Sequence, residues 1–150
     1  MKYLFLSGKK IAPLPTSIGR LAALGILFLY RNILTAVPAS IGSLTALTYL
    51  YLNNNRIATL PTTIGGMTAL TTLRLTNNQL AGLPDAIGQL TGLEELCLGS
   101  NQLAALPESI VALTNLTYVN LVNNPLLIRS AQSAAVQAWL QPHESDDDAW

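Results

Sequence analysis

The sequence predicts an α/β solenoid, in which short strands and return segments coil around one shared core. Two observations predict this fold class. A Leu-Pro or Val-Pro pair recurs every 23 residues, with its first member at Leu14, Val37, Leu60, Leu83 and Leu106. The residues around each pair follow one pattern, L-x-x-L-x-L-x-x-N-x-L-x-x-L-P-x-x-I-G-x-L-x-x. A fixed period in this range is typical of stacked repeat architectures.

Five full copies of the pattern begin at Met1, Leu24, Leu47, Leu70 and Leu93, and a decayed sixth begins at Leu116. Seven positions of each copy (1, 4, 6, 11, 14, 18 and 21) are apolar, and all 35 of them in the full copies are Leu, Ile, Val or Met. We therefore expect repeats over residues 1–128, a C-terminal capping helix over 129–141 and an acidic tail over 142–150.

Each copy contains a strand signal and a return signal. The L-x-L step, such as Leu50 and Leu52, predicts one short strand whose intervening residue faces away from the core. Strands one coil apart would then pair in parallel. The Pro-x-x-Ile-Gly segment predicts a short helical or 3-10 turn, because proline presets the backbone for such a start and lacks the N–H that the start leaves unpaired.

Position 9 predicts an internal ladder of asparagines. An amide side chain carries donors and an acceptor, so it can satisfy backbone groups that turn inward after the strand. The rungs are Asn32, Asn55, Asn78, Asn101 and Asn124. Lys9 replaces asparagine in the first copy, which also has no polar segment before it to cover the core. Three explanations of that feature are open: a fragment of a longer repeat domain, self-association through this open end, or a frayed end that the fold tolerates. We favour the first two.

The repeat pattern stops in the sixth copy, where Arg129 and Ser133 take apolar positions. We expect a capping helix with Ser130 as its N-cap and Pro142 as its stop. Trp139 is the predicted lid over the last repeat.

These residues resemble the leucine-rich repeat proteins of the 23-residue type, found in Ras-group, Scribble-type and many bacterial intracellular proteins. The motif LPxxIGxLTxLxxLxLxxNxL covers about residues 1–126. The resemblance implies a right-handed solenoid with a short parallel concave sheet and 3-10 or short helices on the convex side. It implies little about function, because one fold serves many ends.

Composition narrows the function classes. The only histidine, His143, lies in the tail, and no Cys/His spacing suits a metal, so we expect no catalytic residues, metal or cofactor. The longest apolar run has ten residues, too few to cross a bilayer. One cysteine, Cys97, suggests a reducing, cytoplasmic compartment. Net charge is zero, so we expect no nucleic-acid partner, yet residues 1–75 carry +7 and residues 76–150 carry −7.

Aromatic residues mark the predicted binding surface. Seven of the nine Phe, Tyr and Trp residues occupy positions 3, 5 or 7, which face away from the core. Tyrosine and arginine are common at interfaces, although aromatic residues also favour strands. We predict a non-enzymatic module that binds a protein or peptide on the concave face. The predicted contacts are Phe28, Tyr30, Tyr49, Tyr51, Arg56, Arg74 and Tyr118.

Two alternatives stay open at this stage. In one interpretation the chain is a self-associating structural unit whose basic and acidic ends meet, forming a homo-oligomer through the uncapped first repeat. In the other interpretation it is the recognition segment of a larger enzyme or of a bacterial effector.

Overall fold

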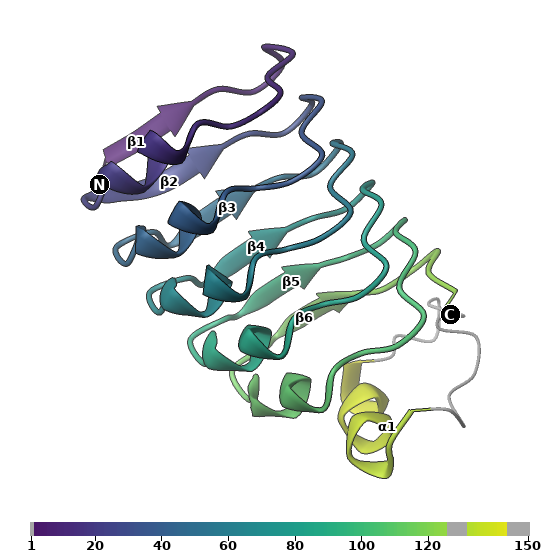
Figure 1. The fold of residues 1–150 in the computed structure, drawn as a ribbon. Coiled ribbons are helices and arrows are strands. Elements are labelled where there is room, and N and C mark those ends of the chain that lie inside the picture. The colour runs from purple at the N-terminus through teal and green to yellow at the C-terminus, as the bar shows by residue number, and fades with distance from the viewer. Residues whose placement is uncertain (1, 126–131, 144–150) are drawn as a thin grey trace.

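The computed structural model of this chain describes residues 2–125 and 132–143 as a solenoid of stacked coils (Figure 1). Six short strands form one parallel sheet whose order follows the sequence. The strands are β1 (Lys2–Phe5), β2 (Leu24–Phe28), β3 (Tyr49–Tyr51), β4 (Thr72–Arg74), β5 (Glu95–Cys97) and β6 (Tyr118–Asn120). The predicted solenoid of the α/β class is confirmed.

The register of the sheet repeats the 23-residue spacing. Tyr51 of β3 pairs with Phe28 on one side and Arg74 on the other. Leu50 in the same strand pairs with Leu27 and Leu73. Because side chains alternate along a strand, the leucines enter the core while the residues flanking them form a solvent-facing surface, which we call the sheet face.

A five-residue 3-10 helix returns the chain on the opposite side of each of the first five coils (Figure 1). These helices are η1 (Thr16–Arg20), η2 (Ala39–Ser43), η3 (Thr62–Gly66), η4 (Asp85–Gln89) and η5 (Glu108–Ala112). The repeated proline does not occupy the first helical position. It lies one residue earlier, as an extended N-cap such as Pro61 with φ −69° and ψ 148°, and its carbonyl accepts the N–H of Ile64 at 3.0 Å.

The glycine after each isoleucine lets neighbouring 3-10 helices approach closely. A Cβ on Gly42 would lie 2.1 Å from the carbonyl oxygen of Thr63 in the next coil, so any side chain there would force the coils apart. Val111 takes this position in η5 and is partly exposed. The next described element against η5 is a helix of a different kind, which removes the constraint on that residue.

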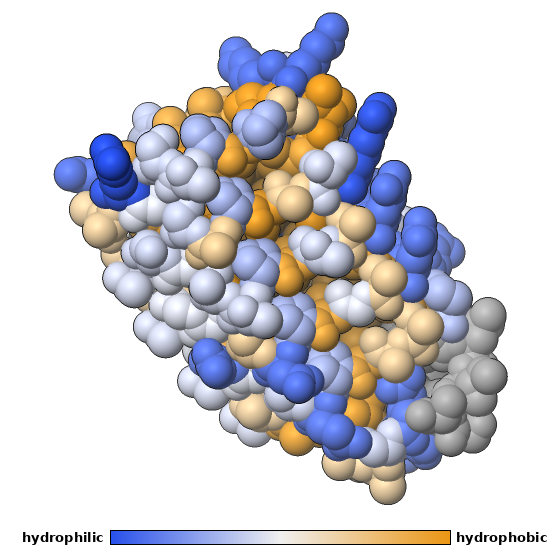
Figure 2. All heavy atoms as spheres, in the orientation of Figure 1, coloured by the Kyte–Doolittle hydropathy of each residue, from blue (hydrophilic) through white to orange (hydrophobic). Residues whose placement is uncertain are grey.

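The core runs the length of the solenoid between the sheet and the 3-10 helices. Leu27, Leu50 and Leu73 lie behind one another with no exposed surface. Figure 2 shows the hydrophobic residues as a band that follows the axis between paler surfaces. Each coil alone has its apolar groups open on two sides, so stacking is what removes them from water.

Buried asparagines bind the backbone where the chain leaves each strand. Asn55 donates from Nδ2 to the carbonyls of Leu52 at 2.9 Å and Leu29 at 3.0 Å, and its Oδ1 accepts the N–H of Leu34 at 3.1 Å. Equivalent bonds are made by Asn32, Asn78, Asn101 and Asn124. Each of these asparagine side chains therefore links its own coil to the coil before it.

A short helix, α1 (Ala134–Leu140), packs against η5 and leads into η7 (Gln141–His143). Val136 and Leu140 are buried, and Trp139 packs against the core. The side chain of Ser133 caps the helix by accepting the N–H of Val136 at 3.2 Å. The predicted N-cap, Ser130, lies outside the described residues.

Candidate functional site

Four aromatic rings lie in contact on the sheet face, and we call them the aromatic cluster: Phe5, Phe28, Tyr30 and Tyr51. The parallel register places Phe5, Phe28 and Tyr51 side by side. Phe28 stacks on Tyr51 with a centroid separation of 5.0 Å and an interplanar angle of 14°. Tyr30 meets Phe5 and Phe28 edge-on, at 5.9 Å and 6.4 Å. These contacts fix an apolar surface that no part of the core needs.

A hollow of about 440 Å³ adjoins this cluster, and we call it the aromatic hollow. Its walls combine aromatic rings, cations and amides. They comprise Phe28, Tyr30, Arg31, Tyr51, Asn53, Asn54 and Arg74. The guanidinium of Arg74 lies 5.4 Å from the centroid of the Tyr51 ring, within the range of a cation–π interaction. The hollow therefore offers flat apolar walls beside two positive charges.

A second hollow of about 450 Å³ lies further along the sheet face, and we call it the polar hollow. It is lined by Thr72, Arg74, Glu94, Glu95, Cys97, Thr117 and Tyr118. Arg74 borders both hollows. It forms the wall between a region with aromatic rings and a region with carboxylates.

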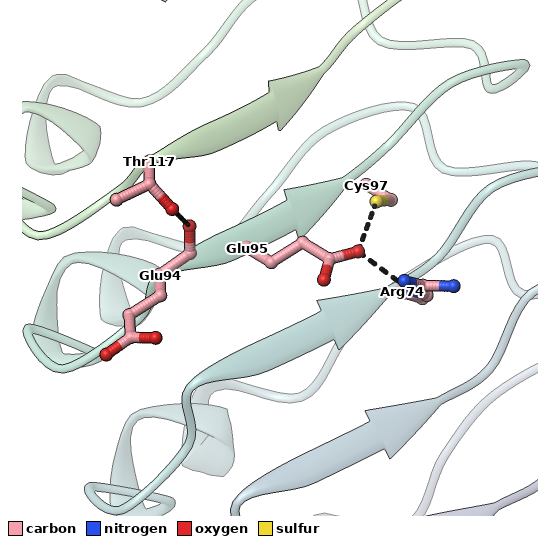
Figure 3. Close-up of polar contacts among 5 residues, drawn as sticks. All are labelled: Arg74, Glu94, Glu95, Cys97 and Thr117. Atoms are coloured by element: carbon pink, nitrogen blue, oxygen red, sulfur yellow. Dashed lines mark hydrogen bonds and ion pairs between the residues drawn. The ribbon is translucent and has the colours of Figure 1, made fainter.

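An ion pair joins these two regions. The Nε of Arg74 donates to Oε1 of Glu95 at 2.7 Å, and the thiol of Cys97 donates to the same oxygen at 3.2 Å (Figure 3). Glu95 also holds the pKa of the Arg74 guanidinium above its ordinary value. In Figure 3 the carboxylate of Glu94 extends away from this group, and its backbone carbonyl accepts the hydroxyl of Thr117 at 3.1 Å.

Cys97 is not a reactive thiol. Burial raises its pKa to about 12, and the hydrogen bond to Glu95 acts in the same direction. A nucleophilic cysteine needs the opposite shift, because the thiolate is the reactive form.

Among residues 2–125 and 132–143, no three His, Cys, Asp or Glu side chains are placed to hold a metal ion. No described helix is long and apolar enough to cross a membrane.

Arg31 has an unusual backbone conformation at the edge of the aromatic hollow. Position 8 of every described copy has positive φ, and Arg31 has φ 56°. The other copies place Gly8, Asn54, Asn77, Ser100 and Asn123 there. Glycine and asparagine tolerate this left-handed region best, whereas a long side chain is disfavoured in it.

Comparison with protein families decides which family this is. The family described as leucine-rich repeat region matches residues 1–79, and the family described as leucine rich repeat matches residues 68–126. The chain belongs to the leucine-rich repeat family. The resemblance seen in its sequence is thereby confirmed. A search of curated proteins gives no match for this leucine-rich repeat protein.

Two solved structures resemble it. A leucine-rich repeat protein of Leptospira interrogans is 35% identical, with a TM-score of 0.84 over 95% of this chain and 35% of the other. The ectodomain of the plant membrane receptor kinase GASSHO1/SCHENGEN3 from Arabidopsis thaliana, solved in complex with CASPARIAN STRIP INTEGRITY FACTOR 2, is 36% identical. Its TM-score is 0.70 over 82% of this chain and 15% of the other. This leucine-rich repeat protein thus spans about a third or less of the length of these chains.

The structure divides the predicted contact residues of this leucine-rich repeat protein into three groups. Phe28, Tyr30, Tyr51 and Arg74 line the aromatic hollow. Tyr118 lines the polar hollow with Arg74. Tyr49 and Arg56 form the third group and line neither of the two hollows. Tyr49 pairs with Ile26 on one side and with Thr72 on the other, in the neighbouring row of the sheet face.

Sequence reasoning did not select Glu95, Asn53 or Asn54 for the site. The signal for Glu95 lies in the repeat: it follows Arg74 by 21 residues, which places position 3 of one copy diagonally beside position 5 of the copy before it. Asn53 and Asn54 belong to a polar run that also contains the buried Asn55, and the ladder drew attention to that residue alone.

Proposed function

We propose that this leucine-rich repeat protein is a non-enzymatic module that binds a protein or peptide segment on its sheet face. The aromatic cluster is the observation that carries this proposal. Four contacting rings lie on the solvent side of a sheet whose core is already filled by aliphatic residues. Aromatic and arginine side chains in such a cluster are typical of the residues that dominate binding energy.

Further support comes from the family and from the chemistry of the site. Leucine-rich repeats commonly mediate protein–protein interaction, using the extended inner surface of the solenoid. The ectodomain from Arabidopsis thaliana was solved in complex with CASPARIAN STRIP INTEGRITY FACTOR 2. The protonated thiol of Cys97 and the paired carboxylate of Glu95 favour a binding role over a catalytic one.

The proposed contact surface comprises Phe28, Tyr30, Tyr49, Tyr51, Arg56, Arg74 and Tyr118. Its centre is the stacked pair Phe28 and Tyr51, which is rigid because each ring touches its neighbour. Rigid aromatic anchors lose little conformational entropy on binding, so they contribute more affinity than flexible side chains of similar size.

The test is a selection of random 16-residue peptides on the immobilised protein, followed by affinity measurement on variants. The combined change Tyr30→Ala, Tyr49→Ala and Tyr51→Ala should lower the affinity of the selected peptides by at least about a hundredfold. The matched control is the combined change Thr16→Ala, Ser43→Ala and Thr45→Ala on the 3-10 helix side, where all three residues are exposed. Binding that survives in the tyrosine variant, with an unchanged circular dichroism spectrum, would refute the proposed surface.

Self-association is the second candidate, and one observation favours it. β1 is the end strand of the sheet, and nearby side chains are exposed: Tyr3 by 72%, Phe5 by 53% and Leu21 by 41%. An exposed edge of this kind can pair with another copy. Light scattering over a range of concentrations, at low and high salt, tests it. A constant monomer mass would rule out this candidate.

We also propose that the protein resides in the cytoplasm, because its one cysteine forms no internal disulfide and lies buried as a free thiol. Fractionation of the source cells checks this, and recovery in an extracytoplasmic fraction would refute it.

A further inference from the structure

We propose that the aromatic hollow recognises an acidic peptide segment that carries an adjacent apolar side chain. A carboxylate of the segment binds Arg31 and Arg74, and the apolar side chain lies on Phe28 and Tyr51. This inference rests on the proposed function and names the class of peptide that the sheet face takes.

Arg31 supplies the first argument. Its backbone N–H donates to the carbonyl of Asn53 at 3.0 Å, which holds the residue in the left-handed region. Glycine or asparagine occupies position 8 in most copies, whereas the second copy has the long, positively charged side chain of Arg31 there. Among the described residues Arg31 forms no ion pair, and its side chain is exposed on the wall of the hollow. A cation kept at a disfavoured position and left without an acid is suited to a ligand that brings one.

Arg74 supplies the second argument. Its ion pair with Glu95 uses Nε, and no described residue binds its two terminal nitrogens. Its side chain is 46% exposed. Because Glu95 and Tyr51 hold the guanidinium from two sides, its remaining donors are fixed before a ligand arrives. Fixed donors can bind a carboxylate through two parallel hydrogen bonds with little loss of side-chain entropy.

The distribution of charge supplies the third argument and sets a direction. The first acid in the sequence is Asp85, and Glu95, the acid that pairs with Arg74, lines the polar hollow and not the aromatic hollow. The polar hollow contains both Glu94 and Glu95. A ligand that crosses the sheet face must therefore carry its negative charges over β2 to β4 and be neutral or basic over β5 and β6.

This charge pattern favours a peptide over single-stranded nucleic acid. Aromatic rings and arginines also suit stacked bases. A nucleic acid, however, carries a phosphate at every step and would place some of them against Glu94 and Glu95. A peptide can confine its acids to one end. The half-buried amides of the hollow, Asn53 and Asn54, can in addition bind a peptide backbone.

The experiment measures fluorescence anisotropy of labelled peptides on the full chain. The probe is the acidic peptide GSEEFEDS. The uncharged peptide GSQQFQNS tests the carboxylates, GSEEGEDS tests the apolar side chain, and an eight-residue oligothymidine tests nucleic acid. We expect the acidic peptide to bind at least about tenfold more tightly than either altered peptide, because it alone makes both the charged and the apolar contacts.

Arg31→Asn is the decisive variant. It should weaken the acidic peptide by about tenfold, leave the uncharged peptide unchanged, and raise the urea midpoint of unfolding, because asparagine suits positive φ. Loss of binding with gain of stability cannot arise from misfolding. Arg20→Gln is the control, since it removes the same charge from an exposed residue of η1. Equal weakening by both variants would overturn the inference.

Other outcomes also overturn it, and one set separates it from the proposed function. Equal affinity for the acidic and uncharged peptides, or tighter binding of the oligothymidine, rejects an acidic peptide as the ligand. If the random selection recovers peptides that lack acids but depend on Tyr30 and Tyr51, the inference fails and the proposed function stands. If no selected peptide depends on these tyrosines, both fail.

Discussion

Replacing Asn55 with alanine tests whether the buried asparagines hold successive coils together. The change removes the only acceptor of the Leu34 N–H, and a buried unpaired donor costs about 1–3 kcal/mol. The carbonyls of Leu29 and Leu52 also lose a donor, but each keeps another. The side-chain amide of Asn32 still donates to Leu29, and that of Asn78 still donates to Leu52. We therefore expect the free energy of unfolding to fall by about 2–3 kcal/mol. Asn53→Ala, at a partly exposed neighbour, should change it by less than about 0.5 kcal/mol.

A second substitution at the same residue makes this reasoning sharper. Asn55→Asp keeps an acceptor for Leu34 but turns a carboxylate oxygen toward the carbonyls of Leu29 and Leu52. At pH 7, Asn55→Asp should lower the free energy of unfolding by more than Asn55→Ala does. The pKa of the new carboxyl would rise above its unfolded value of about 3.9, so the protein regains stability below that pH and loses it as pH rises.

Urea unfolding followed by far-ultraviolet circular dichroism, at pH 7 and pH 3.5, measures all three variants. A cost for Asn55→Ala no larger than that of the Asn53→Ala control would refute the ladder argument. So would an Asn55→Asp protein that is more stable than Asn55→Ala at pH 7, because the side-chain amide would then not be acting as a donor.

Four further predictions concern three other positions of the coil, Gly42, Cys97 and Arg31. Gly42→Ala should destabilise the protein by about 1–3 kcal/mol, since its Cβ would meet Thr63, whereas Gly82→Ala has open space and should not; urea midpoints compare the two. Cys97 should react with Ellman's reagent at pH 8 about a thousandfold more slowly than in urea, because its pKa is raised from 9.0 to about 12; equal rates would contradict the burial argument. Because the pKa of Cys97 is higher in the folded than in the unfolded protein, its contribution to stability is complete below about pH 9 and is lost as pH rises toward about 12. Cys97→Ala should reduce this loss of stability at high pH. Arg31→Asn should stabilise the fold by about 1 kcal/mol in urea unfolding, and a lower midpoint would contradict the backbone argument.

The fold could be predicted from sequence because the period determines the neighbours of each residue. Once the repeat is 23 residues long, Leu27, Leu50 and Leu73 must lie behind one another, and the strand register has that spacing. Local sequence and global packing agree here: the same isoleucine that enters the core also follows the proline that starts each 3-10 helix. Because local sequence and global packing favour the same structure, the fold of a repeat protein can be predicted from its sequence.

The C-terminal end was harder to predict because the period no longer applies there. Ser130 and Ser133 are both acceptable N-caps before a run of alanines, and helix propensity does not separate them. The helix α1 begins after Ser133. Gln132, just before it, is buried and accepts the N–H of Leu106 at 3.1 Å. That contact joins residues 26 apart with no repeated partner, so nothing in the sequence pattern indicates it.

The site shows where prediction from the repeat stops. The lattice of a solenoid places Arg74 beside Tyr51, Cys97 and, on the diagonal, Glu95, so the possible partners of its side chain are known from spacing alone. The period does not say which of them the guanidinium binds, because that depends on rotamer and charge. Here Glu95 takes Nε and the Tyr51 ring lies 5.4 Å from the guanidinium. One rotamer thus places a single cation between an aromatic surface and a carboxylate surface, and this placement gives the sheet face the direction that a ligand must match.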